Sequence, residues 1–176
     1  MELTTKEIFG LLHGIVLGSL FLLSFGASFV WLRSYNQELL SEEGRIIRNK
    51  RMQAVIWFLA LMCWFTVISG TFITYPWYRA VPKEGDLLIN YPQALLKASK
   101  NTSSWHSFGM EWKEHIGWLS PFIFTAVAYI ASMSGETIAK NEYLRKALML
   151  LLSLAFISVA VAALLGALIT KKAPII

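Results

Sequence analysis

Four long stretches without any charged residue dominate the chain. None of them contains Asp, Glu, Lys or Arg, and they are Ile8–Leu32, Ala54–Tyr78, Ile116–Met133 and Ala147–Thr170. Because about 20 consecutive apolar residues cross the hydrocarbon layer of a bilayer, each stretch predicts one transmembrane helix. Uncharged runs of this length argue against a transmembrane barrel, whose strands read as short alternating segments. We therefore expect an all-α membrane protein with four transmembrane helices in an up-down-up-down bundle.

The predicted helices divide the chain into spans and connections within one domain, residues 1–176. We place the spans at about 8–32, 54–78, 112–134 and 146–170. Four crossings put both termini on one membrane face, called side A, together with the loop 79–111. Side B carries the connection 33–53, whose mixed apolar and charged residues predict a helical hairpin. The apolar members of that connection are Tyr35, Leu39, Leu40, Ile46 and Ile47.

Composition changes the picture only slightly. Charged residues make up 15% of the 176 residues, against about 25% in an ordinary soluble domain. A net charge of +5 suggests nucleic acid in a soluble protein, but here we attribute it to basic loops that meet the anionic lipid bilayer, and we expect no nucleic acid partner. The single cysteine, Cys63, cannot form an intramolecular disulfide, and the absence of a C-x-x-C-H motif excludes covalent c-type haem attachment.

Charge also bears on orientation. Side A and side B carry eight Lys and Arg residues each, but those of side B lie in shorter connections, which count most in the positive-inside rule. We therefore expect side B to be cytoplasmic and the termini to be extracytoplasmic, in a bacterial inner membrane. The first apolar run is too long for a cleavable signal peptide, so we expect the first helix to be retained.

The three histidines are the most informative side chains. His13 lies five residues after the first uncharged stretch begins, and His115 lies directly before the third. An ionisable side chain at membrane depth is costly and indicates a function. Because the first and third spans run in the same direction, we expect His13 and His115 at a similar depth near side A.

Helix geometry suggests what these two histidines could hold. Adjacent helix axes lie about 8–10 Å apart, so the diagonal between the first and third helices of a bundle is about 11–14 Å. Two histidine side chains and two iron–nitrogen bonds of about 2 Å together span about 13 Å. A b-type haem with His13 and His115 as axial ligands therefore fits this diagonal.

Further residues could complete such a site, although each has a second interpretation. Gly10, Gly14 and Gly18 form a row beside His13 that would admit either a flat porphyrin or a tightly packed helix. On side A, Arg79 follows the second span and Lys113 precedes the uncharged part of the third. There they would neutralise haem propionates or simply reach the membrane surface.

The third histidine leaves several alternatives open. His106 could replace His115 as a ligand, bind a quinone headgroup or face water. Glu111 and Glu114 could relay protons beside a quinone, or could stabilise the start of a helix through its dipole. A zinc site made by Glu111, His115 and His106 has little support, because the H-E-x-x-H motif is missing.

The layout resembles the four-helix membrane cytochromes b, the haem-bearing anchor subunits of respiratory oxidoreductases. The resemblance rests on His13, His115, the glycine row and the four spans. It implies transfer of electrons between a peripheral redox partner and quinone through haem held by helix histidines. Two-haem members of that group need four ligands, but this chain has no histidine near side B, so the resemblance implies at most one haem.

We therefore expect a membrane electron-transfer subunit that binds one b-type haem through His13 and His115. It would pass electrons between a partner such as a peripheral cytochrome and quinone, beside other membrane subunits of a respiratory or photosynthetic complex, and would not be a complete enzyme by itself. The main alternative is a cofactor-free accessory subunit of a larger membrane complex. A small transporter or metal-dependent membrane enzyme is a third possibility, although the spans carry few of the polar groups near their middle that transport requires.

Overall fold

The computed structural model describes residues 2–35 and 41–175, which form helices and no strand. The all-α prediction is therefore confirmed for these residues. Residues 36–40, including Leu39 and Leu40 of the predicted hairpin connection, lie outside the described residues. Among those described, four helical stretches are long and apolar enough to cross a membrane, as the sequence predicted: Thr5–Arg33, Glu42–Tyr78, Lys100–Met133 and Glu142–Lys172.

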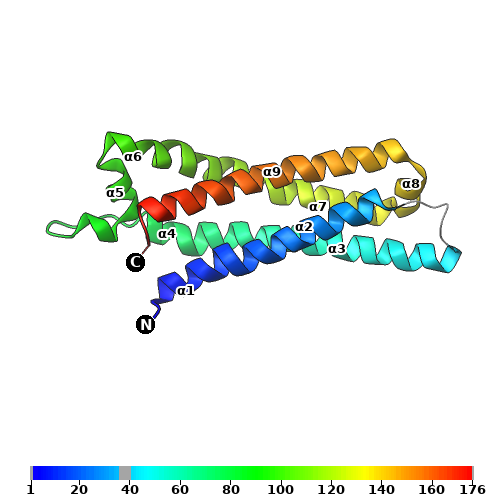
Figure 1. Ribbon diagram of the computed structural model, residues 1–176, viewed down its shortest axis with the longest axis horizontal. Helices are drawn as coiled ribbons and strands as arrows, with labels where there is room; N and C mark the ends of the chain where they lie inside the picture. Colours follow the sequence, from blue (N-terminus) through cyan, green and yellow to red (C-terminus); the bar gives the residue numbers. More distant parts are fainter. Residues whose placement is uncertain (1, 36–40, 176) are drawn as a thin grey trace. The chain divides into compact units, whose positions relative to one another are not determined.

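These stretches and the segments between them contain fourteen described elements, and Figure 1 labels the α-helices. The first stretch consists of α1 (Thr5–Leu11), η1 (Leu12–Leu17) and α2 (Gly18–Arg33), and the second of α3 (Glu42–Ser69), η3 (Gly70–Thr74) and α4 (Tyr75–Tyr78). A turn η4 (Leu88–Asn90) and α5 (Pro92–Lys97) lead to the third stretch, α6 (Lys100–Ser104), η5 (Trp105–Met110), η6 (Trp112–Ile116) and α7 (Gly117–Met133). The short α8 (Gly135–Lys140) precedes α9 (Glu142–Lys172).

Local sequence explains where several helices begin. Thr4 and Glu7 form a capping box at α1, in which the Thr4 hydroxyl accepts from the Glu7 N–H and the Glu7 carboxylate accepts from the Thr4 N–H. Helix α5 begins at Pro92, whose missing N–H costs nothing in the first turn. The third helical stretch begins at Lys100, so part of the predicted loop 79–111 is helical.

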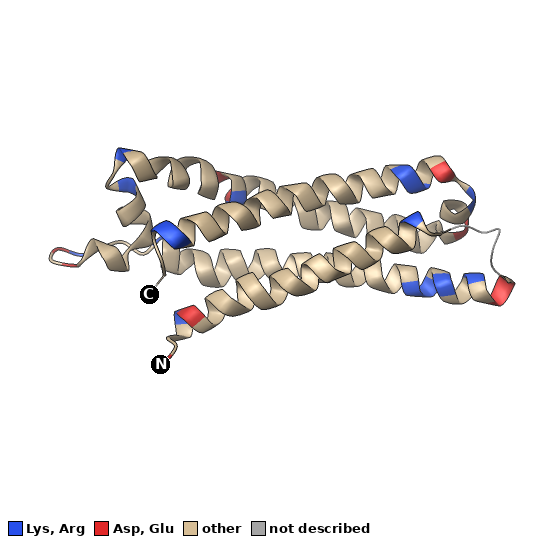
Figure 2. Ribbon diagram, in the orientation of Figure 1, with Lys and Arg blue, Asp and Glu red and all other residues tan. Residues whose placement is uncertain are grey.

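Charges lie mainly towards the ends of the first, second and fourth long helices, whereas the third also carries Glu111, Lys113 and Glu114 within its length (Figure 2). In α3, for example, the acidic residues Glu42 and Glu43 occupy the first turn, where they face the positive end of the helix dipole. In α9 the last turn carries Lys171 and Lys172, which suit the negative end. The distribution is compatible with an integral membrane protein.

The chain divides into two compact units, and both combine pieces of all four long helices. Unit 1 contains Met1–Gly18, Phe65–Trp118 and Ser158–Ile176, and unit 2 contains Ser19–Trp64 and Leu119–Ile157. The core of unit 1 includes the buried residues Tyr78, Leu96, Met110, Ile169 and Ala173, and in Figure 1 α5 lies beside the end of α9.

Unit 2 is held by aromatic packing and by hydrogen bonds between helices. Phe21 contacts Phe124 edge to face, with ring centroids 5.6 Å apart. The indole N–H of Trp64 donates to the Thr125 hydroxyl at 3.0 Å. Apolar surface and paired polar groups thus both connect the helices of this unit.

Candidate functional site

His13 is held by a chain of hydrogen bonds that fixes its tautomer. Its Nδ1 lies 2.9 Å from the Ser69 hydroxyl oxygen, and that hydroxyl donates to the backbone carbonyl of Thr66 at 3.1 Å. With its single hydrogen directed to Thr66, Ser69 accepts from His13 Nδ1–H. In this arrangement the neutral ring carries its free lone pair on Nε2.

The His13 ring occupies space that Gly70 leaves open. A Cβ atom added to Gly70 would lie 2.9 Å from the ring atom Cε1 and 3.4 Å from Nε2. A side chain at position 70 would thus displace the ring. In the sequence, Ser69 was one of the few polar residues of the spans that hinted at transport, and nothing connected Ser69 or Gly70 with His13.

His115 lies in a different environment. Its Nδ1 lies 3.0 Å from the backbone carbonyl of Glu111, one turn earlier. A carbonyl only accepts, so Nδ1 carries the hydrogen and Nε2 again has the free lone pair. The side chain is 70% exposed. His13 and His115 both belong to unit 1, but their rings contact different groups.

His106 differs from the other two histidines because both its ring nitrogens are engaged. The amide nitrogen of Gln93 lies 3.4 Å from Nε2, and since this amide nitrogen only donates, Nε2 accepts. Nδ1 then donates to the Tyr78 hydroxyl at 2.8 Å, and the two rings stack with centroids 6.0 Å apart. Both ring nitrogens of His106 thus lie within hydrogen-bonding distance of a side chain of unit 1.

An apolar pocket adjoins His13. Its volume is about 280 Å³, and its lining consists of Phe9, Leu12, His13, Val16, Leu17, Ser69 and Ile73. His13 and Ser69 supply its polar side chains, and they already bond to each other. Apolar walls with a few convergent polar groups are typical of cofactor and ligand sites.

The basic residues proposed for the site lie in contrasting positions. A Cβ atom added to Gly166 would lie 2.8 Å from the Lys113 ammonium nitrogen. Lys113 interacts electrostatically with His13 and forms no ion pair with a described residue. Arg79 instead donates to the Tyr75 hydroxyl at 3.1 Å, and this hydroxyl donates to Glu114 at 2.5 Å. Lys113 therefore has no carboxylate partner among the described residues, and Glu114 is bound by Tyr75.

The glycine row of the first helix is open. A Cβ atom at Gly10, Gly14 or Gly18 would meet no atom within 4 Å. No described part of this chain forms a tight seam with these glycines. A flat ligand or another molecule could still lie against them.

Irregular helix geometry coincides with the histidines of the candidate site. The described residues include four π-helical segments, η1, η3, η5 and η6. They contain the three histidines, Gly70 and Lys113. π-helical turns are rare and often occur at functional sites, and the four described ones all belong to unit 1.

The described residues contain no group of three or more His, Cys, Asp and Glu side chains that could hold a metal ion. The zinc site considered for Glu111, His115 and His106 is therefore not assembled. Comparison with protein-family models, with curated proteins and with solved structures finds no match to this chain. The inference of function rests on the side chains themselves.

Proposed function

We propose that this chain is a membrane electron-transfer subunit that binds one b-type haem through Nε2 of His13 and Nε2 of His115. The observation that carries the proposal is the hydrogen bonding of the two rings: each Nδ1–H is bound to an oxygen, of Ser69 or of the Glu111 carbonyl, and each Nε2 is free. Histidines that ligate metals usually donate their other N–H in this way. Such a haem supplies one-electron chemistry, because its iron alternates between the ferric and ferrous states.

Other residues support the same function. Ser69 would orient the His13 ring, and the apolar pocket beside it would exclude water from the ligand. The Lys113 ammonium has no carboxylate partner among the described residues, so it is available to a propionate. The open glycine row would admit a flat macrocycle.

The setting we propose is a bacterial inner membrane. The four apolar helices would cross it in an up-down-up-down bundle, with both termini extracytoplasmic. Electrons would pass between a peripheral redox partner, such as a cytochrome, and quinone, within a complex that includes other membrane subunits. A reporter enzyme that is active only outside the cytoplasm, fused after Lys172, tests the orientation: activity supports it, and an inactive but intact fusion overturns it.

The test of the haem site is a visible spectrum of the purified protein, oxidised and then reduced with dithionite. We expect a reduced α-band that is lost in His13→Ala and His115→Ala. His106→Ala is the matched control and should keep the band, because both nitrogens of His106 are engaged by Tyr78 and Gln93. Loss of the band in His106→Ala but not in His115→Ala would overturn this ligand assignment.

One observation favours a second candidate, a cofactor-free accessory subunit. The His115 side chain is 70% exposed and bonds only within its own helix, as an ordinary surface histidine would. The same spectrum decides between the two functions. A preparation from haem-replete cells without an α-band would support the accessory role.

A further inference from the structure

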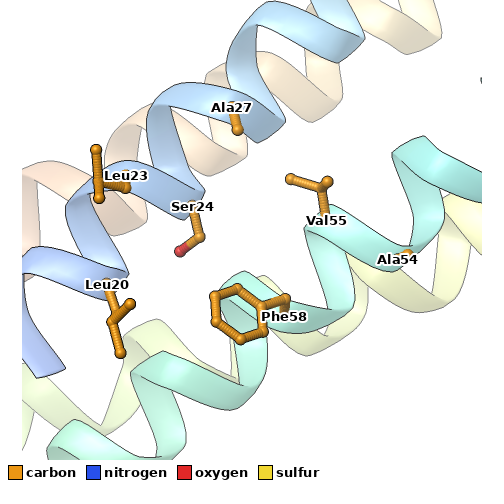
Figure 3. A pocket seen from close by; sticks show the side chains of 7 residues that line it. All are labelled: Leu20, Leu23, Ser24, Ala27, Ala54, Val55 and Phe58. Carbon is orange, nitrogen blue, oxygen red and sulfur yellow. The ribbon is translucent and has the colours of Figure 1, made fainter.

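Unit 2 contains an apolar groove between α2 and α3 that the proposed electron transfer does not use. Its volume is about 370 Å³. Figure 3 shows that the lining side chains come from both helices; they are Leu20, Leu23, Ser24, Ala27, Ala54, Val55 and Phe58. The groove is hollow where the small side chains of Ala27 and Ala54 lie, and the larger residues form its walls.

The groove suits an occupant without hydrogen-bonding groups. The single polar side chain in its lining, Ser24, donates its hydroxyl hydrogen to the Phe21 carbonyl at 2.9 Å. All lining residues lie in the first two uncharged stretches of the sequence. At hydrocarbon depth the apolar chain of a lipid is the occupant that needs no polar contact.

Two cations stand above one end of this groove. Lys50 and Arg51 precede Ala54 and Val55 by four residues in the continuous helix α3, and residues four apart lie one above the other on a helix face. Long side chains on a helix point towards its N-terminus, so both cations extend from the groove towards the charged end of α3. Both are exposed and form no ion pair with a described residue.

The neighbouring Arg48, unlike Lys50 and Arg51, already binds other groups of the chain. Its guanidinium donates to the Ser34 carbonyl at 2.8 Å and to the Ser34 hydroxyl at 2.6 Å, and it lies 5.1 Å from the centre of the Trp31 ring. Arg48 thus connects α3 to the end of the first helical stretch. Lys50 and Arg51 remain for an external anion.

We propose that the groove binds one acyl chain of an anionic phospholipid, whose phosphate pairs with Lys50 and Arg51. Charge complementarity selects this occupant, because an uncharged hydrophobic molecule would use the groove alone and leave the two cations unpaired. The proposal rests on the membrane insertion proposed above but is independent of the haem, since it concerns only unit 2.

Native mass spectrometry of the detergent-purified protein tests the proposal with phosphatidylglycerol and phosphatidylcholine as probes. We expect one retained phosphatidylglycerol per chain and at least fivefold lower occupancy by phosphatidylcholine. Ala54→Leu fills the groove and should lower phosphatidylglycerol occupancy at least fivefold. The double variant Lys50→Gln/Arg51→Gln should abolish the preference between the two lipids.

Matched controls separate a specific site from general lipid coating. Ala163→Leu changes an exposed alanine of α9, and Lys140→Gln removes an exposed cation of α8; neither should alter occupancy. If Ala54→Leu retains as much lipid as Ala163→Leu, the groove is not the site and the proposal is wrong. If Ala54→Leu instead changes the number of chains per particle, the groove packs against a second copy or another helix, which also overturns it. Absence of haem would affect none of these readouts.

Discussion

At the scale of the residue, the important feature is a chain of hydrogen bonds that ends at a carbonyl. The Thr66 carbonyl takes the only hydrogen of Ser69, so Ser69 takes the hydrogen of His13 Nδ1. This order leaves His13 Nε2 as an acceptor inside a helix that is apolar enough to cross a membrane. In the haem site that we propose, Ser69 is the residue that orients the His13 ring.

The role of Ser69 gives a prediction. Replacing Ser69 with Ala removes the acceptor of His13 Nδ1–H and leaves the ring free to rotate. We expect haem affinity to fall about 10–100-fold, the usual effect of losing a partner of a metal-bound histidine. Titration of the haem-free protein with haem, followed by absorbance, measures this. Ser69→Thr keeps the hydroxyl and should restore most of the affinity; equal affinities of the Ala variant and the native chain would show that Ser69 does not position the ring.

A second prediction concerns the exposed turn between α4 and α5. The Asp86 carboxylate accepts from the Tyr91 hydroxyl and, at 2.9 Å, from the Lys83 N–H, and these bonds hold the pKa of Asp86 below its ordinary value of 3.8. Because the folded pKa is lowered, the bonds stabilise the turn above the ordinary pKa and are lost as the pH falls through the lowered value. We expect an NMR titration of the Asp86 side-chain carboxyl carbon to have its midpoint at a lower pH in the native chain than in Tyr91→Phe. Identical midpoints in the two proteins would contradict the hydrogen bond between Tyr91 and Asp86.

The residues of the site divide into those that a sequence can reveal and those that it cannot. His13 and Lys113 were identifiable because charge and ring nitrogens are conspicuous beside uncharged stretches. Ser69 and Gly70 were not, since small residues are common in membrane helices and matter here only because His13 meets them. The partners of His106 depend on how the segment 79–111 folds, which hydropathy does not encode.

At the scale of the element, the π-helical segments distinguish unit 1 from a regular bundle. Hydropathy predicted the existence of the four long helices, because each uncharged stretch is close to or longer than the about 20 residues that cross a bilayer. It placed the start of the third span at about residue 112, whereas helix already begins at Lys100. Lys113, Glu114 and their neighbours are too polar to read as a span, although a helix accommodates them by turning their side chains towards Gly166 and Tyr75.

The segment η3 gives an element-scale prediction. Gly70→Ala would place a Cβ atom 2.9 Å from the His13 ring and force the ring away from Ser69. We expect haem binding to weaken at least tenfold while the helix content by circular dichroism stays constant, since alanine favours helices. Gly117→Ala is the matched control because a Cβ at Gly117 meets nothing within 4 Å; it should bind haem like the native chain. Equal binding by both variants would show that the close approach at Gly70 is unimportant.

At the scale of the whole molecule, the proposed haem site and the proposed lipid site lie in different units. Unit 1 holds the three histidines, the chain termini and the π-helical segments, and unit 2 holds the apolar groove with its two cations. Hydropathy alone could not have made this division, because both units draw on the same four uncharged stretches. It arises from side chains that contact one another across helices, such as Trp64 with Thr125 in unit 2 and His13 with Ser69 in unit 1.

The central claim is that His13 and His115 together hold one haem in each chain. Its most direct test is the haem content of the purified native protein, measured as the pyridine haemochromogen and divided by the protein concentration from amino-acid analysis. We expect one non-covalent haem b per chain, and less than a tenth of that amount in the double variant His13→Ala/His115→Ala. A native protein from haem-replete cells with no haem, or a double variant that retains the full amount, would contradict it.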